Sequence, residues 1–290
     1  MSTIPYTRCT LCDQPGTLEG ATDVARIPCN VRRFKNDVFT LWRCTGCLSI
    51  HCAEMVDLAA YYADYPLKTQ QLTFHERIGY GKRLRLLESH GLRRTDKLLD
   101  YGCGIGLFVD FLRARGFAHV SGYDAFVPAY NDPRVIGATY DAVVSYDVIE
   151  HYEDPRECMR SLANLLAPGG ILVVGTPRAD GVSTARKSAP QLHPPYHRHI
   201  LSERVLLALG REQGMKAMRV YRRSYADSLV PFVNTRYIAR YLQLTGGFMD
   251  SAVEERHAGL LLRAPDLLFL AFFGYFLPRG DDCLITFRKN

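Results

Sequence analysis

The sequence lacks an uninterrupted apolar stretch of about 18 residues, which excludes a predicted transmembrane helix. Its first residues, MSTIPYTRCTLC, lack an apolar core and a small-residue cleavage site, so we expect no secretory signal. It also lacks a concentrated run of one charge, because its net charge of +6 is spread over 290 residues. A nucleic-acid-binding protein usually gathers its basic residues into one stripe, so nucleic acid is a disfavoured partner.

The composition excludes a disordered or collagen-like chain, since 47% of the residues are hydrophobic and 23% are charged. Nine cysteines are an odd number, and no export signal accompanies them. A disulfide framework is therefore disfavoured. Reduced thiols, a metal site and a cytoplasmic location fit this cysteine usage better.

The cysteines divide the chain into unequal parts. Five of the nine lie between residues 9 and 47, and a sixth is Cys52. A segment as short as residues 1–55 buries too little apolar surface to fold without a bound metal or a disulfide bond. We therefore expect a small metal-binding module there. Residues 56–91 are predicted to form a linker and an amphipathic helix, and residues 92–290 the main domain.

Two Cys-x-x-Cys pairs, Cys9 with Cys12 and Cys44 with Cys47, are separated by 31 residues. Zinc binds four thiolates tetrahedrally, and a two-residue gap lets both sulfurs of one turn reach the same ion. The spacing predicts a structural zinc ion in a zinc-ribbon-like module. A redox pair or free thiols are the alternatives, and three residues are spare ligand candidates: Cys29, His51 and Cys52.

Beyond Lys97, apolar strand patterns alternate with helical patterns, which predicts an α/β fold with a parallel, Rossmann-like sheet covered by helices on both faces. The expected strands are residues 97–101, 118–124, 141–147, 171–176 and 282–289. The expected helices are residues 105–116, 154–170 and 201–214, the last with Ser202 as its N-cap. Residues 226–280 are interpreted as an insertion before the last strand.

The segment 98-LLDYGCGIG-106 joins a buried strand to a helix through a glycine-rich turn. Such a turn lets the backbone pass close under a ligand, and the helix N-terminus offers free N–H groups. Asp124 closes the next strand 20 residues after Gly104, where a carboxylate can accept hydrogen bonds from ribose hydroxyls. An NAD-linked oxidoreductase could use the same turn, but Leu107 stands where the dinucleotide fingerprint needs its third glycine.

The glycine spacing, together with 140-YDAVVSYDVIEHYEDP-155, 162-LANLLAPGGILVVGTP-177 and 194-PPYHRHILS-202, resembles the class I S-adenosylmethionine-dependent methyltransferases. The resemblance is to small-molecule enzymes of the ubiquinone-biosynthesis type. It covers roughly residues 75–225 and the final strand. It implies transfer of a methyl group from S-adenosylmethionine to oxygen or carbon of a small-molecule acceptor.

The resemblance also implies roles for individual residues. The methionyl end of the cofactor would be held by Asp100, Gly102, Cys103 and Gly104. Asp124 would bind the ribose, and Ser145 and Tyr146 would form the floor of the site. Only 16 residues separate Asp124 from Asp141, where many relatives insert a helix, a strand and an adenine-binding loop, so the adenine contacts stay unassigned.

Two histidines are candidates for removing a proton from the acceptor, because the ordinary pKa of imidazole suits a base near neutrality. His151 follows the 141–147 strand, and His197 lies after the 171–176 strand. His151 could instead only shape the helix that follows it. A tyrosine group, Tyr61, Tyr62 and Tyr65, could close over the cofactor or pack the linker.

Similar zinc modules precede methyltransferase domains in some sugar and some ribosomal RNA methyltransferases, so a zinc-ribbon RNA methyltransferase is the main alternative. The motif His193-Pro194-Pro195-Tyr196 does not support it. The Asn-Pro-Pro-Tyr signature of base-amino methyltransferases must follow the fourth strand, and Tyr146-Asp147-Val148 occupies that place here.

Residues 267-LLFLAFFGYFL-277 form an uncharged run that is too short to cross a membrane. Three interpretations are open: a buried helix or dimer contact, a roof over the acceptor pocket, or a peripheral membrane contact. In the last case Arg263 and Arg279 would meet anionic head groups. The sequence predicts no particular oligomeric state.

Overall fold

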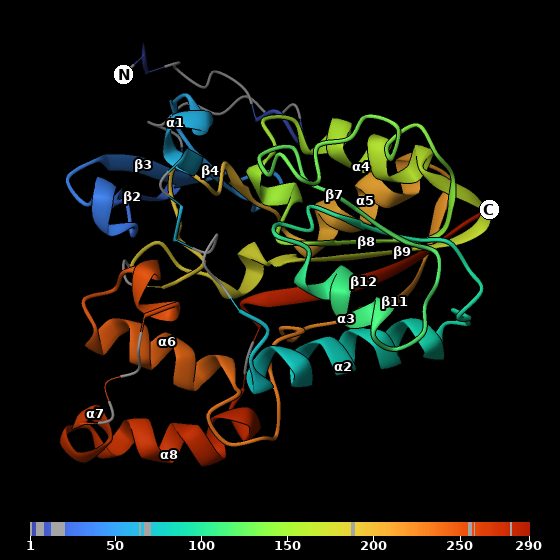
Figure 1. The fold of residues 1–290 in the computed structure, drawn as a ribbon. Helices are drawn as coiled ribbons and strands as arrows, with labels where there is room; N and C mark the ends of the chain where they lie inside the picture. The colour runs from blue at the N-terminus through green and yellow to red at the C-terminus, as the bar shows by residue number, and fades with distance from the viewer. Residues whose placement is uncertain are drawn as a thin grey trace.

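The computed structural model describes residues 2–3, 9–12, 21–63, 65–66, 71–186, 189–254, 257, 259–278 and 280–290. Its main layer is a six-stranded sheet of order β11-β12-β9-β8-β6-β7 (Figure 1). The strands are β6 (Leu98–Tyr101), β7 (Val120–Tyr123), β8 (Tyr140–Tyr146), β9 (Leu166–Pro177), β11 (Met215–Tyr221) and β12 (Asp282–Lys289). Strands β6 to β9 pair in parallel, whereas β12 runs antiparallel between β9 and β11. The predicted Rossmann-like fold is confirmed.

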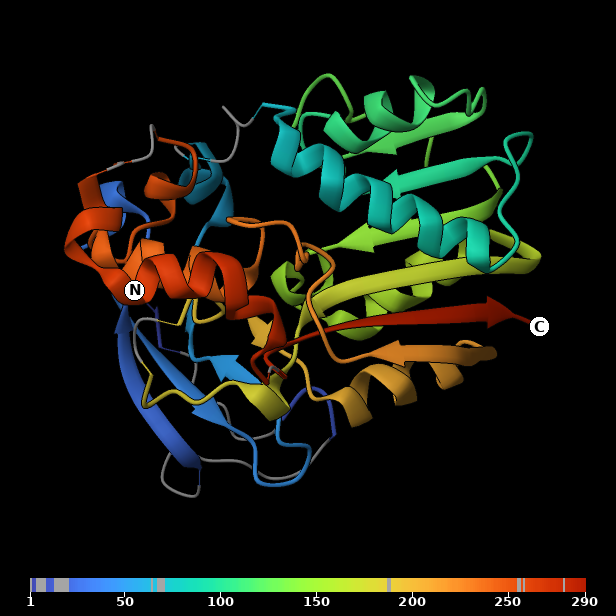
Figure 2. The ribbon, with the colours of Figure 1, turned by 90° about the horizontal axis from the view of Figure 1, so that it is seen from below.

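Helices cover both faces of this sheet, as the buried strands require (Figure 2). They are α2 (Phe74–Ser89), α3 (Leu107–Arg113), α4 (Pro155–Asn164) and α5 (Glu203–Glu212). Side chains alternate across each strand, so Leu98 packs with α2 and α3, while Leu99 packs with α4 and α5. Ser202 caps α5 by accepting a hydrogen bond from the Val205 amide, as predicted.

The predicted helix over residues 154–170 is wrong after Asn164. Strand β9 begins already at Leu166, which pairs with Tyr140 of β8. The register shifts before the next pair, Ala142 with Ile171. Pro168 and two glycines cannot continue a helix, so the chain leaves α4 directly into a bulged strand.

The sheet has β7 as its edge, because the described segment between β7 and β8 forms turns and no strand. This agrees with the short spacing between Asp124 and Asp141.

The N-terminal part is joined to the main domain by strand pairing. Its sheet consists of β2 (Thr22–Pro28), β3 (Val38–Arg43) and β4 (Ile50–Cys52), and β10 (His199–Ile200) extends it as a fourth strand. His199 stands opposite His51 in this pairing. The short strands β1 (Ser2–Thr3) and β5 (Glu54–Met55) pair beside it, and α1 (Leu58–Ala63) leads toward the main domain.

The insertion before β12 contains α6 (Thr235–Leu244), α7 (Gly259–Arg263) and α8 (Pro265–Phe273). Helix α8 packs on α6 through Leu267 and Ala271, which contact the Tyr237 and Tyr241 cluster. Among the described residues, no helix combines the length and the apolar character needed to traverse a bilayer. Arg279, which the sequence suggested as a head-group contact, lies outside the described residues.

Candidate functional site

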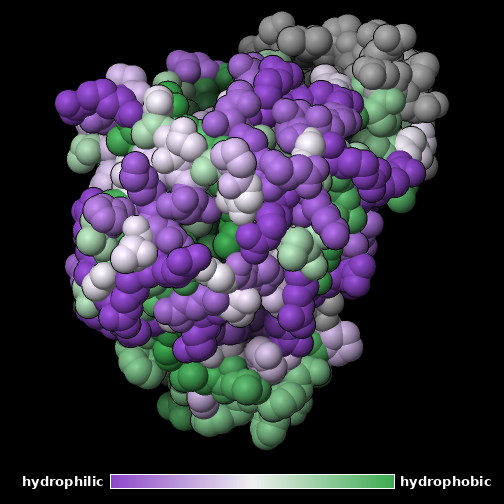
Figure 3. Space-filling model, turned by 90° about the vertical axis from the view of Figure 1, so that its right-hand side faces the viewer, coloured by the Kyte–Doolittle hydropathy of each residue, from purple (hydrophilic) through white to green (hydrophobic). Residues whose placement is uncertain are grey.

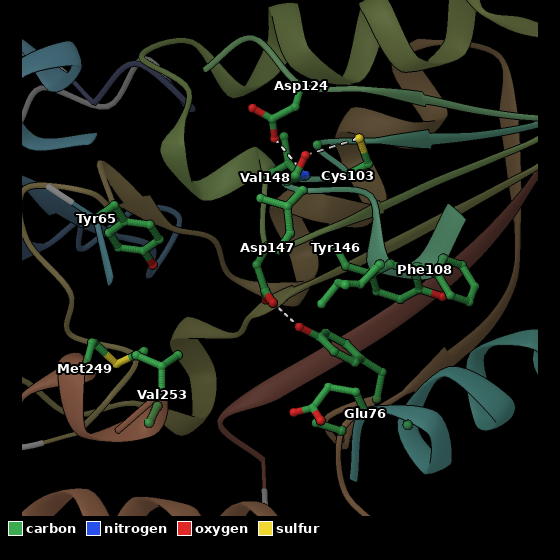
Figure 4. Close-up of a pocket in the computed structure, with 18 of the residues that line it drawn as sticks. Tyr65, Glu76, Cys103, Phe108, Asp124, Tyr146, Asp147, Val148, Met249 and Val253 are labelled. Atoms are coloured by element: carbon green, nitrogen blue, oxygen red, sulfur yellow. Dashed lines mark hydrogen bonds between the residues drawn. The ribbon is translucent and has the colours of Figure 1, made fainter. Parts of the chain in front are cut away.

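A cavity of about 1290 Å³ opens at the carboxyl ends of β6, β7 and β8. Figure 4 shows its two sides, with Asp124, Cys103 and Tyr146 from the sheet domain and Met249 and Val253 from the insertion. Drug-sized ligands occupy pockets of roughly 300–1,000 Å³. The cavity is therefore large enough for a cofactor and an acceptor together.

The glycine turn forms one wall of the cavity and needs glycine for two reasons. Gly102 and Gly106 have φ values of +82° and +83°, which L side chains rarely adopt. A Cβ atom at Gly102 would also overlap Val148, and one at Gly106 would overlap Tyr130. The turn therefore packs closely under Val148 and Tyr130, and Gly102 and Gly104 line the cavity.

Asp124 is fixed at the rim of the turn by two backbone amides. Its Oδ2 accepts from Gly104 N and its Oδ1 from Phe126 N, each at 2.9 Å. These bonds orient the carboxylate toward the cavity that it lines. Each oxygen retains a lone pair for a hydroxyl donor of a bound ligand.

Asp100 and Arg83 are two groups of opposite charge that line the cavity. Burial raises the pKa of Asp100 to about 7, the positive charge of Arg83 opposes this rise, and Asp124 adds to it. The Arg83 guanidinium lies 4.0 Å from the ring centroid of Tyr146 and 3.9 Å from that of Tyr225. Its buried Nε has no hydrogen-bond partner among the described residues.

Sequence reasoning missed Arg83. The available signal was its position on the apolar side of the helix, beside Tyr80 and Leu87, where an arginine is costly to bury without a partner.

Most of the predicted cofactor residues line the cavity together. They are Asp100, Gly102, Cys103, Gly104, Asp124 and Tyr146. Ser145 is the exception: it is buried, lies on the opposite face of β8 from Tyr146 and is not among the residues that line the cavity.

Both predicted histidines line the cavity with their rings 5.0 Å apart. The Nδ1 atom of His151 lies 2.9 Å from the Tyr196 carbonyl oxygen, and that of His197 lies 2.8 Å from the Gln191 carbonyl oxygen. Each contact fixes a proton on Nδ1 and leaves Nε2 as the atom that can meet a ligand. Burial lowers the pKa of His151 to about 4 and that of His197 to about 3, so both rings are neutral at pH 7.

Glu150 lies close to these two histidines, and the sequence analysis did not predict it as a site residue. Its Oε2 accepts from Thr176 Oγ1 at 2.9 Å, while its buried Oε1 has no hydrogen-bond partner in the described part of the chain. Burial, and then the charge of Asp147, raise the pKa of Glu150 well above its ordinary value. One ligand atom from each of Glu150, His151 and His197 lies within 4.8 Å of the others. Two imidazoles and a carboxylate at this separation can hold a divalent cation.

The segment that follows β11 contacts the end of β8 beside this group. Asp147 follows β8 with a φ of +54°, an uncommon conformation for a residue with a side chain. Its carboxylate accepts a hydrogen bond from the hydroxyl of Tyr225, which lies between β11 and the insertion. Figure 4 shows this bond as a dashed line from Asp147.

The tyrosine group serves two purposes. Tyr62 and Tyr65 line the cavity, and the Tyr62 hydroxyl lies 2.9 Å from His151 Nδ1. Tyr61 instead packs in the N-terminal part and donates its hydroxyl proton to Asp37. The linker tyrosines therefore contribute both to the cavity wall and to packing.

The sulfur atoms of the two Cys-x-x-Cys pairs converge within 4.8 Å of one another. The Sγ atoms of Cys9 and Cys47, and those of Cys12 and Cys44, are 3.7 Å apart. Zn–S bonds of about 2.3 Å in a tetrahedron require sulfur separations of about 3.8 Å. The geometry therefore fits a tetrathiolate zinc site.

The spare candidates do not complete this group. Cys29 and Cys52 are buried in a separate apolar cluster. His51 lies just outside the thiolates, with Nε2 at 3.4 Å from Cys9 Sγ and Nδ1 at 2.8 Å from His199 Nδ1. His199 Nε2 in turn lies 3.0 Å from the carbonyl oxygen of Glu153, which lines the cavity.

A family model described as a methyltransferase domain matches residues 74–220. The ubiquinone biosynthesis O-methyltransferase of Caulobacter sp. (strain K31) is 32% identical over 132 residues, which cover 38% of this chain and 49% of that protein. Its counterpart from Neisseria meningitidis serogroup C is 26% identical over 117 residues, covering 32% and 49%. The chain thus spans about half the length of the curated relatives it matches.

Among solved structures, a methyltransferase dependent on S-adenosylmethionine from Archaeoglobus fulgidus is similar, with a TM-score of 0.47 and 15% identity. The similarity covers 79% of this chain and all of that one.

Proposed function

Because the chain belongs to the class I S-adenosylmethionine-dependent methyltransferase family, we propose that it transfers a methyl group from S-adenosylmethionine to oxygen or carbon of a lipophilic small molecule. The observation that carries the proposal is the cavity itself. It combines the glycine turn and Asp124 on one side with an apolar chamber on the other. Enclosure by α6 and residues 249–254 supports a small acceptor over an RNA strand.

The residues present fit the cofactor. Asp124 would accept hydrogen bonds from the ribose hydroxyls, and the backbone of the glycine turn would contact the methionyl part. Asp100 would neutralise the amino group and Arg83 the carboxylate, since they are opposite charges buried in one cavity. The bound cofactor supplies an electrophilic methyl group, and the protein aligns the acceptor for in-line attack.

Replacing Asp124 by alanine should weaken binding of S-adenosylhomocysteine by about 10- to 150-fold, because hydrogen bonds to a charged group contribute about 1.5–3 kcal/mol. Calorimetric titration measures this effect. Asp132→Ala is the matched control, since Asp132 is paired with Arg134 on the same loop and does not line the cavity. Equal affinities for both variants would refute the role of Asp124.

Binding of S-adenosylhomocysteine should release a proton near pH 6. The pKa of Asp100 is about 7 in the free protein, and a bound ammonium group favours the ionised carboxylate. Affinity should therefore rise with pH up to about 7 and level off above it. Calorimetry in buffers of different ionisation enthalpy measures the number of protons released on binding. The Asp100→Asn variant should release none. A pH-independent affinity in the wild type would contradict this account.

We further propose that Glu150, His151 and His197 bind a divalent cation beside the methyl-transfer position. The two carbonyl-anchored imidazoles support this role, as does Glu150 Oε1, which no described residue hydrogen-bonds. A cation there would lower the pKa of an acceptor hydroxyl. In the alternative, His151 or His197 removes the acceptor proton directly as a general base.

The N-terminal cysteines are proposed to hold a structural zinc ion. Four thiolates leave no open coordination position, so this ion would stabilise the module and take no part in the reaction. The contacts from Cys9 through His51 and His199 to Glu153 support a positioning role for the module at the cavity rim.

A further inference from the structure

Helices α7 and α8 expose a continuous apolar face on the outside of the insertion. Figure 3 shows hydrophobic side chains gathered at the bottom of the molecule, where these helices lie. The exposed fraction is 91% for Leu262, 52% for Phe269, 54% for Phe273 and 69% for Phe276. Leu268 and Phe272 are also exposed. An exposed aromatic patch of this kind marks an interaction surface.

The inner side of α8 is already occupied. Leu267 and Ala271 are buried against α6, whose Tyr237 and Tyr241 line the cavity. Of the outer phenylalanines, Phe272 contacts Phe232 with ring centroids 5.7 Å apart, whereas Phe269 and Phe273 stack on each other and are about half exposed. Residues 267–277 do not line the cavity, so α6 and not α8 forms its roof.

Cationic side chains contact both ends of α8, and we call them the cationic flank of the apolar face. Arg240 binds Asp266 at the start of α8, and Arg236 donates to the Pro278 carbonyl oxygen beyond its end. Two further cations, Lys82 and Arg223, lie over the ring of Tyr275.

Arg263 is exposed in α7. The carboxylates among these groups are Asp266 and the buried Asp227, which pairs with Arg223. Five cations against two carboxylates leave an excess of three positive charges.

We propose that this face, defined by Leu262, Leu268, Phe269, Phe272, Phe273 and Phe276, docks the protein on an anionic phospholipid surface. Phenylalanine and leucine side chains insert at the boundary between head groups and acyl chains, and the cationic flank meets lipid phosphates. A second copy of the chain fits the face less well. The only acid within residues 259–278 is Asp266, which Arg240 already neutralises, so a self-complementary contact offers no negative group to the flank.

Co-sedimentation with vesicles of phosphatidylcholine, with and without phosphatidylglycerol, tests the proposal. Wild-type protein should bind the anionic vesicles. Phe269→Ser combined with Phe273→Ser should reduce binding by at least about 100-fold, since each buried phenylalanine contributes roughly tenfold or more. Arg263→Gln should reduce binding to anionic vesicles about fivefold. Ile136→Ser, which replaces an exposed apolar residue of the loop before β8, should bind like the wild type.

Two outcomes would overturn the proposal. One is absence of vesicle binding by wild-type protein. The other is a dimer in sedimentation velocity that the double phenylalanine variant converts to monomer, which would assign the face to a second copy. Affinity for S-adenosylhomocysteine is measured on the same preparations. If the protein binds S-adenosylhomocysteine but not vesicles, only the docking proposal fails. If the protein does not bind S-adenosylhomocysteine, the result counts against the proposed function.

Discussion

Replacing His197 by alanine should lower the methyl-transfer rate by about 10²- to 10⁴-fold and leave the affinity for S-adenosylhomocysteine unchanged. His197 lies on the acceptor side of the cavity, with its Nδ1 at 2.8 Å from the Gln191 carbonyl oxygen. Its loss removes either a cation ligand or a base without touching the glycine turn. Single-turnover kinetics and calorimetry separate the two quantities. His119→Ala, at a surface position before β7, is the matched control.

The cation-site hypothesis and the general-base hypothesis predict different responses of the methyl-transfer activity to a chelator. If Glu150, His151 and His197 hold a cation, a chelator should abolish activity and added Mg²⁺ or Mn²⁺ should restore it, while the zinc content stays constant. Glu150→Gln should then remove the response to metal. Activity that is insensitive to the chelator but absent in His197→Ala would assign the histidine as a base. Near-normal rates in both histidine variants would contradict either role.

Replacing Cys44 by serine should abolish zinc binding and unfold the N-terminal module. Structural zinc contributes about 10–16 kcal/mol to the folding of small zinc-binding peptides, so the loss of one of four thiolates leaves this module without its main stabilisation. Elemental analysis should find one zinc per wild-type chain and none in the variant. Limited proteolysis should cut the variant in its first 55 residues.

Cys29→Ser is the control for this experiment. Cys29 is a buried cysteine of the same module but lies outside the group of four sulfurs. It should therefore retain one zinc per chain. Chelator-free wild-type protein without zinc, or equal loss of zinc from both variants, would contradict the site.

The sequence predicts those site residues whose place follows from their position within a single strand or motif. Asp100 lies near the end of β6 and Asp124 directly follows β7. Parallel strands present their carboxyl ends at one edge of a sheet, so the two carboxylates are expected together. The cysteine pairs are predictable for the same reason, since their two-residue spacing already matches one ion. Local spacing fails for Ser145: adjacent residues of a strand face opposite sides, so Ser145 and Tyr146 could not both reach the cavity.

Other parts of the site depend on contacts between distant segments. Arg83 acquires its place only when α2 packs against Tyr146 and Tyr225. Glu150 meets His197 because the Arg198 amide donates to the Glu150 carbonyl oxygen across 48 positions of the chain. The pairing of His199 with His51 joins the two parts of the protein in the same way. No local periodicity marks such contacts, because they result from tertiary packing.

Competition between S-adenosylhomocysteine and NAD⁺ tests the central claim most directly. Native mass spectrometry of the protein, mixed with equal concentrations of both, reports which ligand the cavity holds. We predict a single bound S-adenosylhomocysteine in the wild-type protein and a much smaller bound fraction in Asp124→Ala. Retention of NAD⁺ in place of S-adenosylhomocysteine would contradict the assignment of the glycine turn and Asp124 to methyl transfer.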